Sequence, residues 1–107
     1  MKPGQLVKLP GSIYIVKIPD LVWIGTKKNS YLLYIERANL IKLPIHFYKD
    51  VSPVAGATRF SVDWLSAQKE FQKTNKIRGY KFLHPNGKDY VWLSHYDVEI
   101  LKNLKYI

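Results

Sequence analysis

The pair Asn86-Gly87 stands between two segments that are rich in aromatic and apolar residues. Asparagine and glycine accept the positive φ angles of a type I′ turn, which joins two antiparallel strands through two residues. With such a turn, Phe82 lies opposite Val91 in the paired strands. The sequence therefore predicts a C-terminal β-hairpin over residues 80–93.

The two faces of this predicted hairpin differ in chemistry, because alternate strand residues share a face. One face carries core side chains: Tyr80, Phe82, Val91 and Leu93. The other face mixes positive charge with aromatic rings: Lys81, Leu83, Lys88, Tyr90 and Trp92. The sequence leaves open whether the aromatic rings of this second face are exposed or pack against the rest of the sheet.

Residues 1–44 have the pattern of short strands without a helical period. Turn residues such as Pro10-Gly11 and Pro19-Asp20 interrupt the apolar segments. Four strands are predicted, over residues 5–9, 13–18, 21–25 and 31–36. The second strand is apolar on both faces apart from Lys17, which favours an internal strand covered on both sides.

A single amphipathic helix is predicted over about residues 61–76. Ser61 can cap its start, Asp63 places a negative charge in its first turn, and no Gly or Pro interrupts it. Three apolar residues fall in one sector of this helix: Trp64, Ala67 and Phe71. Three lysines fall in a nearly opposite sector: Lys69, Lys73 and Lys76.

These elements predict one α+β domain over residues 1–107. It has a β-rich half over residues 1–48, a loop over residues 49–60, and the helix and hairpin over residues 61–107. The segments 32–43 and 90–101 share a pattern of strand, one helical or 3₁₀ turn, and closing strand. One sequence leaves open whether this pattern is an internal duplication.

The N-terminal part of the chain carries a short motif of a known barrel family. Residues 2–9 read Lys-Pro-Gly-Gln-Leu-Val-Lys-Leu, and two further apolar segments follow at residues 13–17 and 40–43. Residues 2–44 thus resemble small SH3-like barrels of the KOW and Tudor-like kind, in which a G-x-x-V start opens the first strand. The resemblance implies an SH3-like, mostly antiparallel β-barrel or sheet, and such barrels commonly bind nucleic acid or proteins. The helix and second hairpin are additions that a lone barrel of this kind does not require.

Composition excludes several classes of protein. The chain of 107 residues has no Cys, which removes a disulfide scaffold, a Cys zinc site and a thiol nucleophile. No apolar stretch approaches the roughly 18 residues that span a bilayer. Lys and Pro interrupt the first eleven residues, so these do not have the pattern of a signal peptide. We expect a soluble, cytoplasmic protein that does not act at a membrane.

The charge balance favours a polyanionic partner. The chain has 17 Lys or Arg against 8 Asp or Glu, a net charge of +9. Residues 1–53 hold 8 bases and 3 acids, and residues 54–107 hold 9 bases and 5 acids, so the charge is not confined to a tail. Lysine outnumbers arginine 14 to 3, which points to diffuse attraction to a phosphate backbone. The same abundance of Lys, Ile, Asn and Tyr is also typical of an AT-rich genome, in which case the charge serves solubility.

The first functional interpretation is a non-catalytic protein that binds DNA or RNA with little sequence preference. Such binding combines a positive track for phosphates with aromatic faces for bases. The expected phosphate-attracting residues are Lys69, Lys73, Lys76, Arg78, Lys81 and Lys88. Tyr90 and Trp92 would stack on bases if they are exposed.

Enzyme chemistry has little support in the sequence. No H-x-x-x-H pair, Gly-rich phosphate loop or cluster of acids at metal-ligand spacing occurs. The nearest approach to a metal set is His95, Asp97 and Glu99, which would share one face if they lay on a strand. We expect no catalysis, no metal and no cofactor.

A second interpretation is a phage or mobile-element accessory protein that binds and inhibits a host protein. Compact size, basic charge and AT-rich composition are typical of such proteins. Exposed Trp23, Tyr48 or Tyr96 would then anchor the interface, since aromatic residues are enriched at binding hot spots. A basic binder favours an acidic or nucleic-acid-mimicking surface on the host protein.

Overall fold

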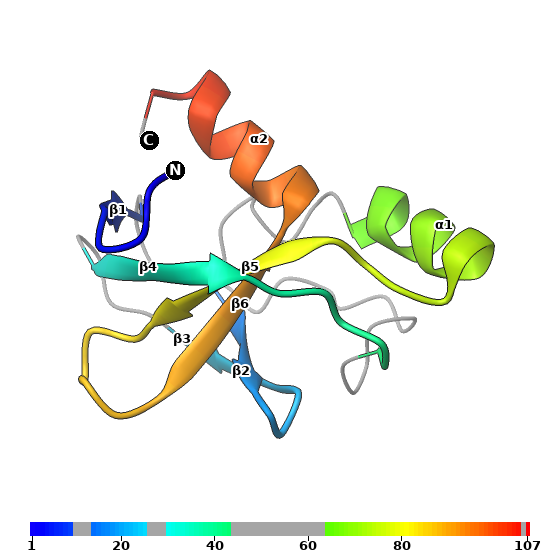
Figure 1. The fold of residues 1–107 in the computed structure, drawn as a ribbon, viewed down its shortest axis with the longest axis horizontal. Coiled ribbons are helices and arrows are strands. Elements are labelled where there is room, and N and C mark those ends of the chain that lie inside the picture. The colour runs from blue at the N-terminus through cyan, green and yellow to red at the C-terminus, as the bar shows by residue number, and fades with distance from the viewer. Residues whose placement is uncertain (10–13, 26–29, 44–63, 106) are drawn as a thin grey trace.

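A computed structural model describes residues 1–9, 14–25, 30–43, 64–105 and 107 of the chain (Figure 1). The predicted loop at 49–60 and the predicted cap Ser61 lie outside these residues. The described elements are two helices and six strands, which follow the chain in the order β1 Leu6–Lys8, β2 Tyr14–Ile18, β3 Val22–Gly25, β4 Tyr31–Arg37, α1 Trp64–Thr74, β5 Gly79–Leu83, β6 Tyr90–Ser94 and α2 His95–Asn103.

All six strands form one antiparallel sheet, in the order β1-β4-β5-β6-β2-β3. The α+β class and the mainly antiparallel pairing predicted from the sequence are therefore confirmed. In the described chain, β1 and β3 stand at opposite edges of the sheet and do not pair with each other. The predicted barrel is not confirmed, because the sheet is open.

The N-terminal strands lie close to their predicted positions. Each of β1 to β4 begins and ends within one residue of its predicted bounds, apart from residue 13 at the start of the second strand, which is not described. β2 lies inside the sheet between β6 and β3, and its Ile15 and Val16 are buried in two different core clusters. The prediction of an internal strand covered on both faces is confirmed.

The C-terminal hairpin has the predicted register but a different turn. Phe82 pairs with Val91. The Gly87 amide donates to the His84 carbonyl oxygen at 2.8 Å, so Pro85 and Asn86 occupy the centre of the turn. Gly87 alone in this turn has a positive φ, 72°, whereas a type I′ turn needs positive φ at both central residues. The predicted type I′ turn is wrong, because Pro85 fixes a negative φ that favours a type I turn.

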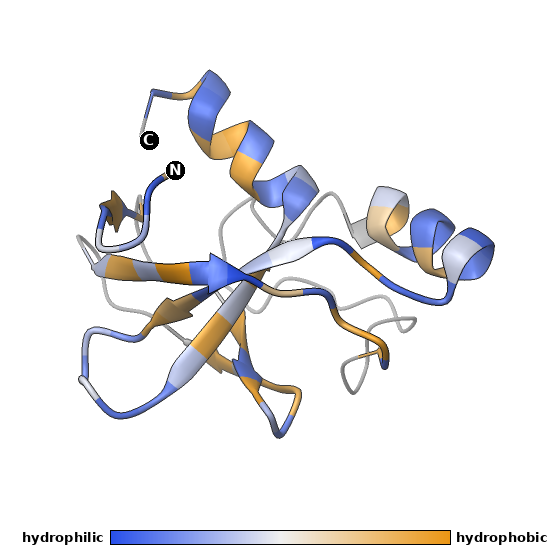
Figure 2. Cartoon of the chain, in the orientation of Figure 1, coloured by the Kyte–Doolittle hydropathy of each residue, from blue (hydrophilic) through white to orange (hydrophobic). Residues whose placement is uncertain are grey.

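The two helices pack against opposite faces of the sheet, each through its own core cluster. On one face, α2 packs against the larger core cluster, whose buried members are Val7, Leu9, Ile15, Leu32, Tyr34, Phe82, Val91, Leu93, Val98 and Leu101. On the other face, α1 packs against a smaller cluster with buried members Val16, Leu40, Ala67, Ile77 and Trp92. Figure 2 shows apolar residues along the strands and several hydrophilic residues along the ribbon of α1.

Helix α1 confirms the predicted helix in part. It covers Trp64–Thr74, within the predicted range of 61–76. Ala67 is buried and Phe71 half-buried against the sheet, while Lys69 and Lys73 are exposed on the other side. The predicted amphipathic arrangement is therefore correct over the described turns.

Helix α2 replaces the turn and closing strand that were predicted after residue 94. Ser94 is its N-cap, and the Ser94 hydroxyl accepts a hydrogen bond from the Asp97 amide at 3.0 Å. Val98 and Leu101 turn into the core with a helical spacing. The resemblance between segments 32–43 and 90–101 does not extend to structure, because the segment after β4 forms a bridge between Leu40 and Ile77 instead of a helix.

Candidate nucleic-acid interface

A hollow lined by positive charge lies beside α1. It is an open depression of about 760 Å³ between α1, the turn that follows it and the start of α2. We call it the basic hollow. Its cationic lining residues are Lys69, Lys73, Lys76 and Arg78. The structure thus brings together four of the six predicted phosphate-attracting residues.

The end of α1 explains why these four residues meet. Asn75 has a φ of 59°, the left-handed conformation in which asparagine often ends a helix. Its amide still donates to the Phe71 carbonyl at 2.8 Å. The Thr74 hydroxyl donates to the Glu70 carbonyl at 2.9 Å and lies 3.0 Å from the Lys76 carbonyl oxygen. The chain therefore reverses tightly and returns Lys76 alongside the last turns of the helix.

The three lysines of the basic hollow have no acidic partner among the residues that the structure describes. Within the described ranges, no carboxylate lies within 4.0 Å of the Nζ of Lys69, Lys73 or Lys76. The acidic side chains that the structure describes interact with other groups: Asp20 and Asp89 with Lys17, Glu36 with Lys81, Glu70 with Arg78, Glu99 with Lys102 and Asp97 with Ser94. The positive charge of the three lysines is therefore available to a ligand.

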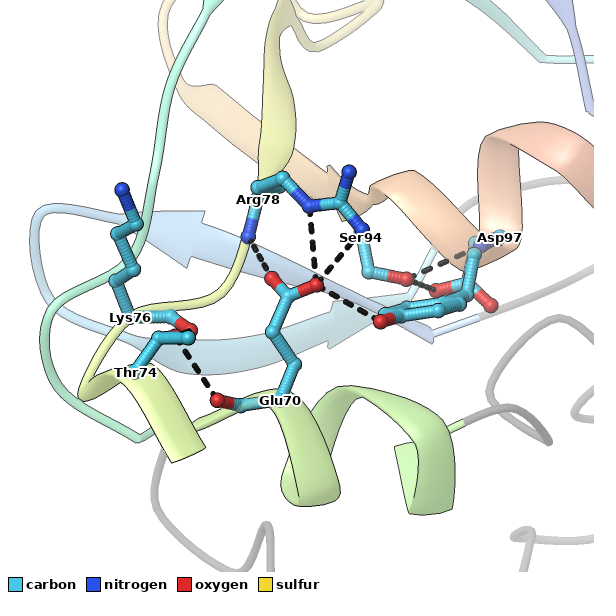
Figure 3. A network of polar contacts seen from close by, with 7 residues as sticks. Glu70, Thr74, Lys76, Arg78, Ser94 and Asp97 are labelled. Atoms are coloured by element: carbon cyan, nitrogen blue, oxygen red, sulfur yellow. Dashed lines mark hydrogen bonds and ion pairs between the residues drawn. The ribbon is translucent and has the colours of Figure 1, made fainter. Parts of the chain in front are cut away.

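Glu70 forms the floor of the basic hollow and holds Arg78 in place (Figure 3). Its side chain is only 10% exposed. The carboxylate accepts hydrogen bonds from the Arg78 amide at 2.6 Å, the Arg78 Nε at 3.0 Å and the Tyr96 hydroxyl at 2.8 Å. A terminal guanidinium nitrogen of Arg78 lies 2.9 Å from the same carboxylate. This network joins α1, the residue that precedes β5, and α2 around one charge.

The ionised form of Glu70 is favoured in the folded protein. Burial opposes its ionisation, but the hydrogen bonds from Arg78 and Tyr96 outweigh burial and hold the pKa of Glu70 below its ordinary value. A lowered folded-state pKa stabilises the fold above the pKa of an unfolded glutamate, about 4.3. This contribution is lost as the pH falls through the folded-state pKa.

Replacing Glu70 with glutamine should lower the free energy of unfolding by about 1 to 2 kcal/mol at pH 7, because the amide loses charge-assisted hydrogen bonds. The difference between the two proteins should stay constant down to about pH 5 and shrink below about pH 4. Urea unfolding of both proteins across this pH range measures it. A difference that grows as the pH falls would show that Glu70 is not stabilised as an anion.

The hairpin residues of the predicted site lie apart from the basic hollow. Figure 1 shows α1 and the β5–β6 connection on opposite sides of the molecule. Lys88 is exposed in that connection. The Lys81 Nζ lies 4.0 Å from a carboxylate oxygen of Glu36 and 4.2 Å above the centre of the Tyr90 ring. The predicted residues therefore divide between two places on the surface.

Trp92 cannot have the predicted base-stacking role. Its side chain is buried, with 3% of its surface exposed, in the core cluster beneath α1. Its indole Nε1 donates to the Ala38 carbonyl at 2.8 Å. Tyr90 remains at the surface, 42% exposed. The alternation that separates the hairpin faces is correct, but α1 covers the part of the second face that contains Trp92.

His95, Asp97 and Glu99 do not form the set considered for a metal. They lie on α2, where residues two apart point in different directions, and the Asp97 side chain bonds with Ser94. Among the residues that the structure describes, no three His, Cys, Asp or Glu side chains are placed to hold a metal ion.

The sequence pattern did not reveal Glu70 and Tyr96 as parts of the candidate site. Glu70 meets Arg78 across a turn, and Tyr96 reaches Glu70 from 26 residues further along the chain, so neither contact follows a local spacing. Tyr96, considered as an exposed anchor for a host protein, is half-buried in this network. Tyr48 and the side chain of Trp23 are not described.

Comparison with known proteins gives no match to a family model, to a curated protein or to a solved structure. No described helix has the length and apolar composition needed to cross a membrane. Any statement about function therefore depends on the charges and contacts of this chain.

Proposed function

We propose that the protein binds DNA or RNA without catalysis, by holding the phosphate backbone in the basic hollow. The observation that carries this proposal is the grouping of Lys69, Lys73 and Lys76 in one hollow without an acidic partner among the described residues. Arg78 lies at the same hollow with its side chain 55% exposed. Together they form a local positive surface that a polyanion would neutralise.

This arrangement favours backbone contacts over base recognition. Lysine ammonium groups bind phosphates as point charges and release condensed counterions, which gives affinity without reading sequence. The exposed ring of Tyr90 is the remaining candidate for base stacking, and it lies away from the basic hollow. The proposed binding is therefore largely independent of sequence and of strandedness.

Affinity should fall steeply with salt. Four phosphate contacts predict a loss of about 150-fold for duplex DNA between about 50 and 200 mM salt, and about 50-fold for a single strand. Fluorescence-anisotropy titrations with labelled DNA and RNA, single-stranded and duplex, measure both values. Absence of binding at the lower salt concentration would contradict the proposed function.

In that event, a pull-down for an acidic host protein would test the inhibitor interpretation. Two further predictions accompany this proposal. Residues 2–44 are predicted to be SH3-like, and the protein is predicted to be cytoplasmic. Both are compatible with a small basic protein that meets nucleic acid inside the cell.

A further inference from the structure

A second, smaller hollow lies where three central strands end. Because neighbouring strands are antiparallel, the end of β4, the start of β5 and the end of β6 lie next to one another. Arg37 therefore pairs with Tyr80, and Gly79 pairs with Ser94, the residue before α2. The hollow at this place has a volume of about 160 Å³ and is lined by Arg37, Asn39, Arg78, Gly79, Tyr80 and His95. We call it the arginine pocket.

The lining of the arginine pocket is suited to an anion. It combines two guanidinium groups with an imidazole and, among the described residues, contains no carboxylate. Arg37 is exposed and has no acidic side chain within 4.0 Å in the described parts of the chain. Its sequence neighbour Glu36 interacts with Lys81.

Glu70 holds the Arg78 side chain in a position in which it also lines the arginine pocket. Glu70 binds the Nε and one terminal nitrogen of Arg78, and Figure 3 shows another terminal nitrogen directed away from Glu70. Arg78 also lines the basic hollow, so the two hollows meet at this side chain. A ligand that occupies both would pass Arg78.

The start of α2 adds to the positive potential of this pocket. His95 is the first residue of this nine-residue helix, at the end where the peptide dipoles place partial positive charge. Its ring stands against the ring of Tyr96 in an edge-on contact with centres 5.6 Å apart. The nearby acids of α2 are engaged, Asp97 with Ser94 and Glu99 with Lys102.

Size and charge together point to one phosphate group. A cavity of about 150 Å³ accommodates a ring of six carbon atoms, so 160 Å³ has room for the five heavy atoms of a phosphate. Guanidinium groups bind phosphate oxygens in pairs. A terminal phosphate monoester carries a charge of about −1.5 to −2 at pH 7 and three free oxygens, whereas an internal phosphodiester carries a single charge.

We propose that the arginine pocket binds the terminal phosphate monoester of a nucleic-acid strand whose backbone lies in the basic hollow. This inference rests on the proposed function, since the strand reaches the pocket along the same surface. Arg37, Arg78 and His95 provide the contacts to the terminal phosphate. Arg37 is specific to this pocket and does not line the basic hollow.

The test compares three single-stranded oligonucleotides of one sequence, with a 5′-phosphate, a 3′-phosphate or hydroxyl groups at both ends. At least one phosphorylated strand should bind about 10-fold more tightly than the hydroxyl strand. Whichever end gives the preference identifies the terminus that is bound. The variant Arg37→Gln should abolish the preference and leave affinity for the hydroxyl strand within about 2-fold.

Lys42→Gln is the matched control, because it removes one charge from an exposed residue outside the pocket. It should keep the preference for the terminal phosphate. Equal binding of all three strands would overturn the inference and leave the proposed function intact. Failure of all three strands to bind would overturn the inference, and failure of the duplex probes as well would overturn the proposed function.

Discussion

Replacing Gly79 with alanine should lower the free energy of unfolding by about 3 kcal/mol or more. A Cβ atom at this position would overlap the indole ring of Trp92. That ring is buried and its Nε1 donates to the Ala38 carbonyl, so displacement would strain the core and leave a buried donor without a partner. Urea unfolding followed by far-ultraviolet circular dichroism measures the loss.

Gly87→Ala is the matched control for this substitution. Gly87 has a φ of 72°, but a Cβ there would meet no atom within 4 Å. Its substitution should therefore cost only the backbone strain, about 1 kcal/mol. If Gly79→Ala were no more destabilising than Gly87→Ala, the close packing of the Trp92 ring on Gly79 would be contradicted.

Reversing the charge of Lys69, Lys73 and Lys76 together, each to glutamate, should weaken nucleic-acid binding by about 100-fold or more at 50 mM salt. Three phosphate contacts are lost and three repulsive charges take their place. All three side chains are exposed, so the fold should remain intact. Anisotropy titration gives the affinity, and thermal unfolding checks the fold.

The control for this reversal changes the net charge by the same amount elsewhere. Lys2, Lys8 and Lys105 are exposed and do not line the basic hollow. Their replacement by glutamate should weaken binding far less than the reversal in the basic hollow. Equal losses in the two triple variants would mean that overall charge, and not the basic hollow, determines affinity.

Local patterns predicted the parts of the structure that depend on local geometry. The position of Asn86-Gly87 predicted the correct pairing of Phe82 with Val91 although the turn type is different, because the observed loop over residues 85–88 is centred on the same two residues. The helical period likewise placed Lys69 and Lys73 opposite Ala67. Lys76 and Arg78 lie beyond the end of α1, and the chain reversal at Asn75 brings them to the same hollow.

The same local patterns did not predict contacts between segments that are distant in the sequence. Whether Trp92 is exposed depends on α1, which covers it from a separate part of the chain. Helix α2 was missed although Ser94 and Asp97 have the spacing of a helix N-cap followed by an acid, because the aromatic and apolar residues after it favoured a strand. The arginine pocket depends on the pairing of β4 with β5, which brings Arg37 to the start of β5, near Arg78.

The strand order also determines when the sheet can assemble. Strands β1 and β4 pair with each other, and so do β2 and β3, but in the described sheet these two pairs are linked by backbone pairing through β5 and β6. An isolated two-stranded pair is at best marginally stable in water. A chain that has left the ribosome only as far as α1 therefore holds two separate strand pairs with no common sheet. Folding of the whole sheet has to await synthesis of the last third of the chain, and the long sequence separation of these pairings slows it further.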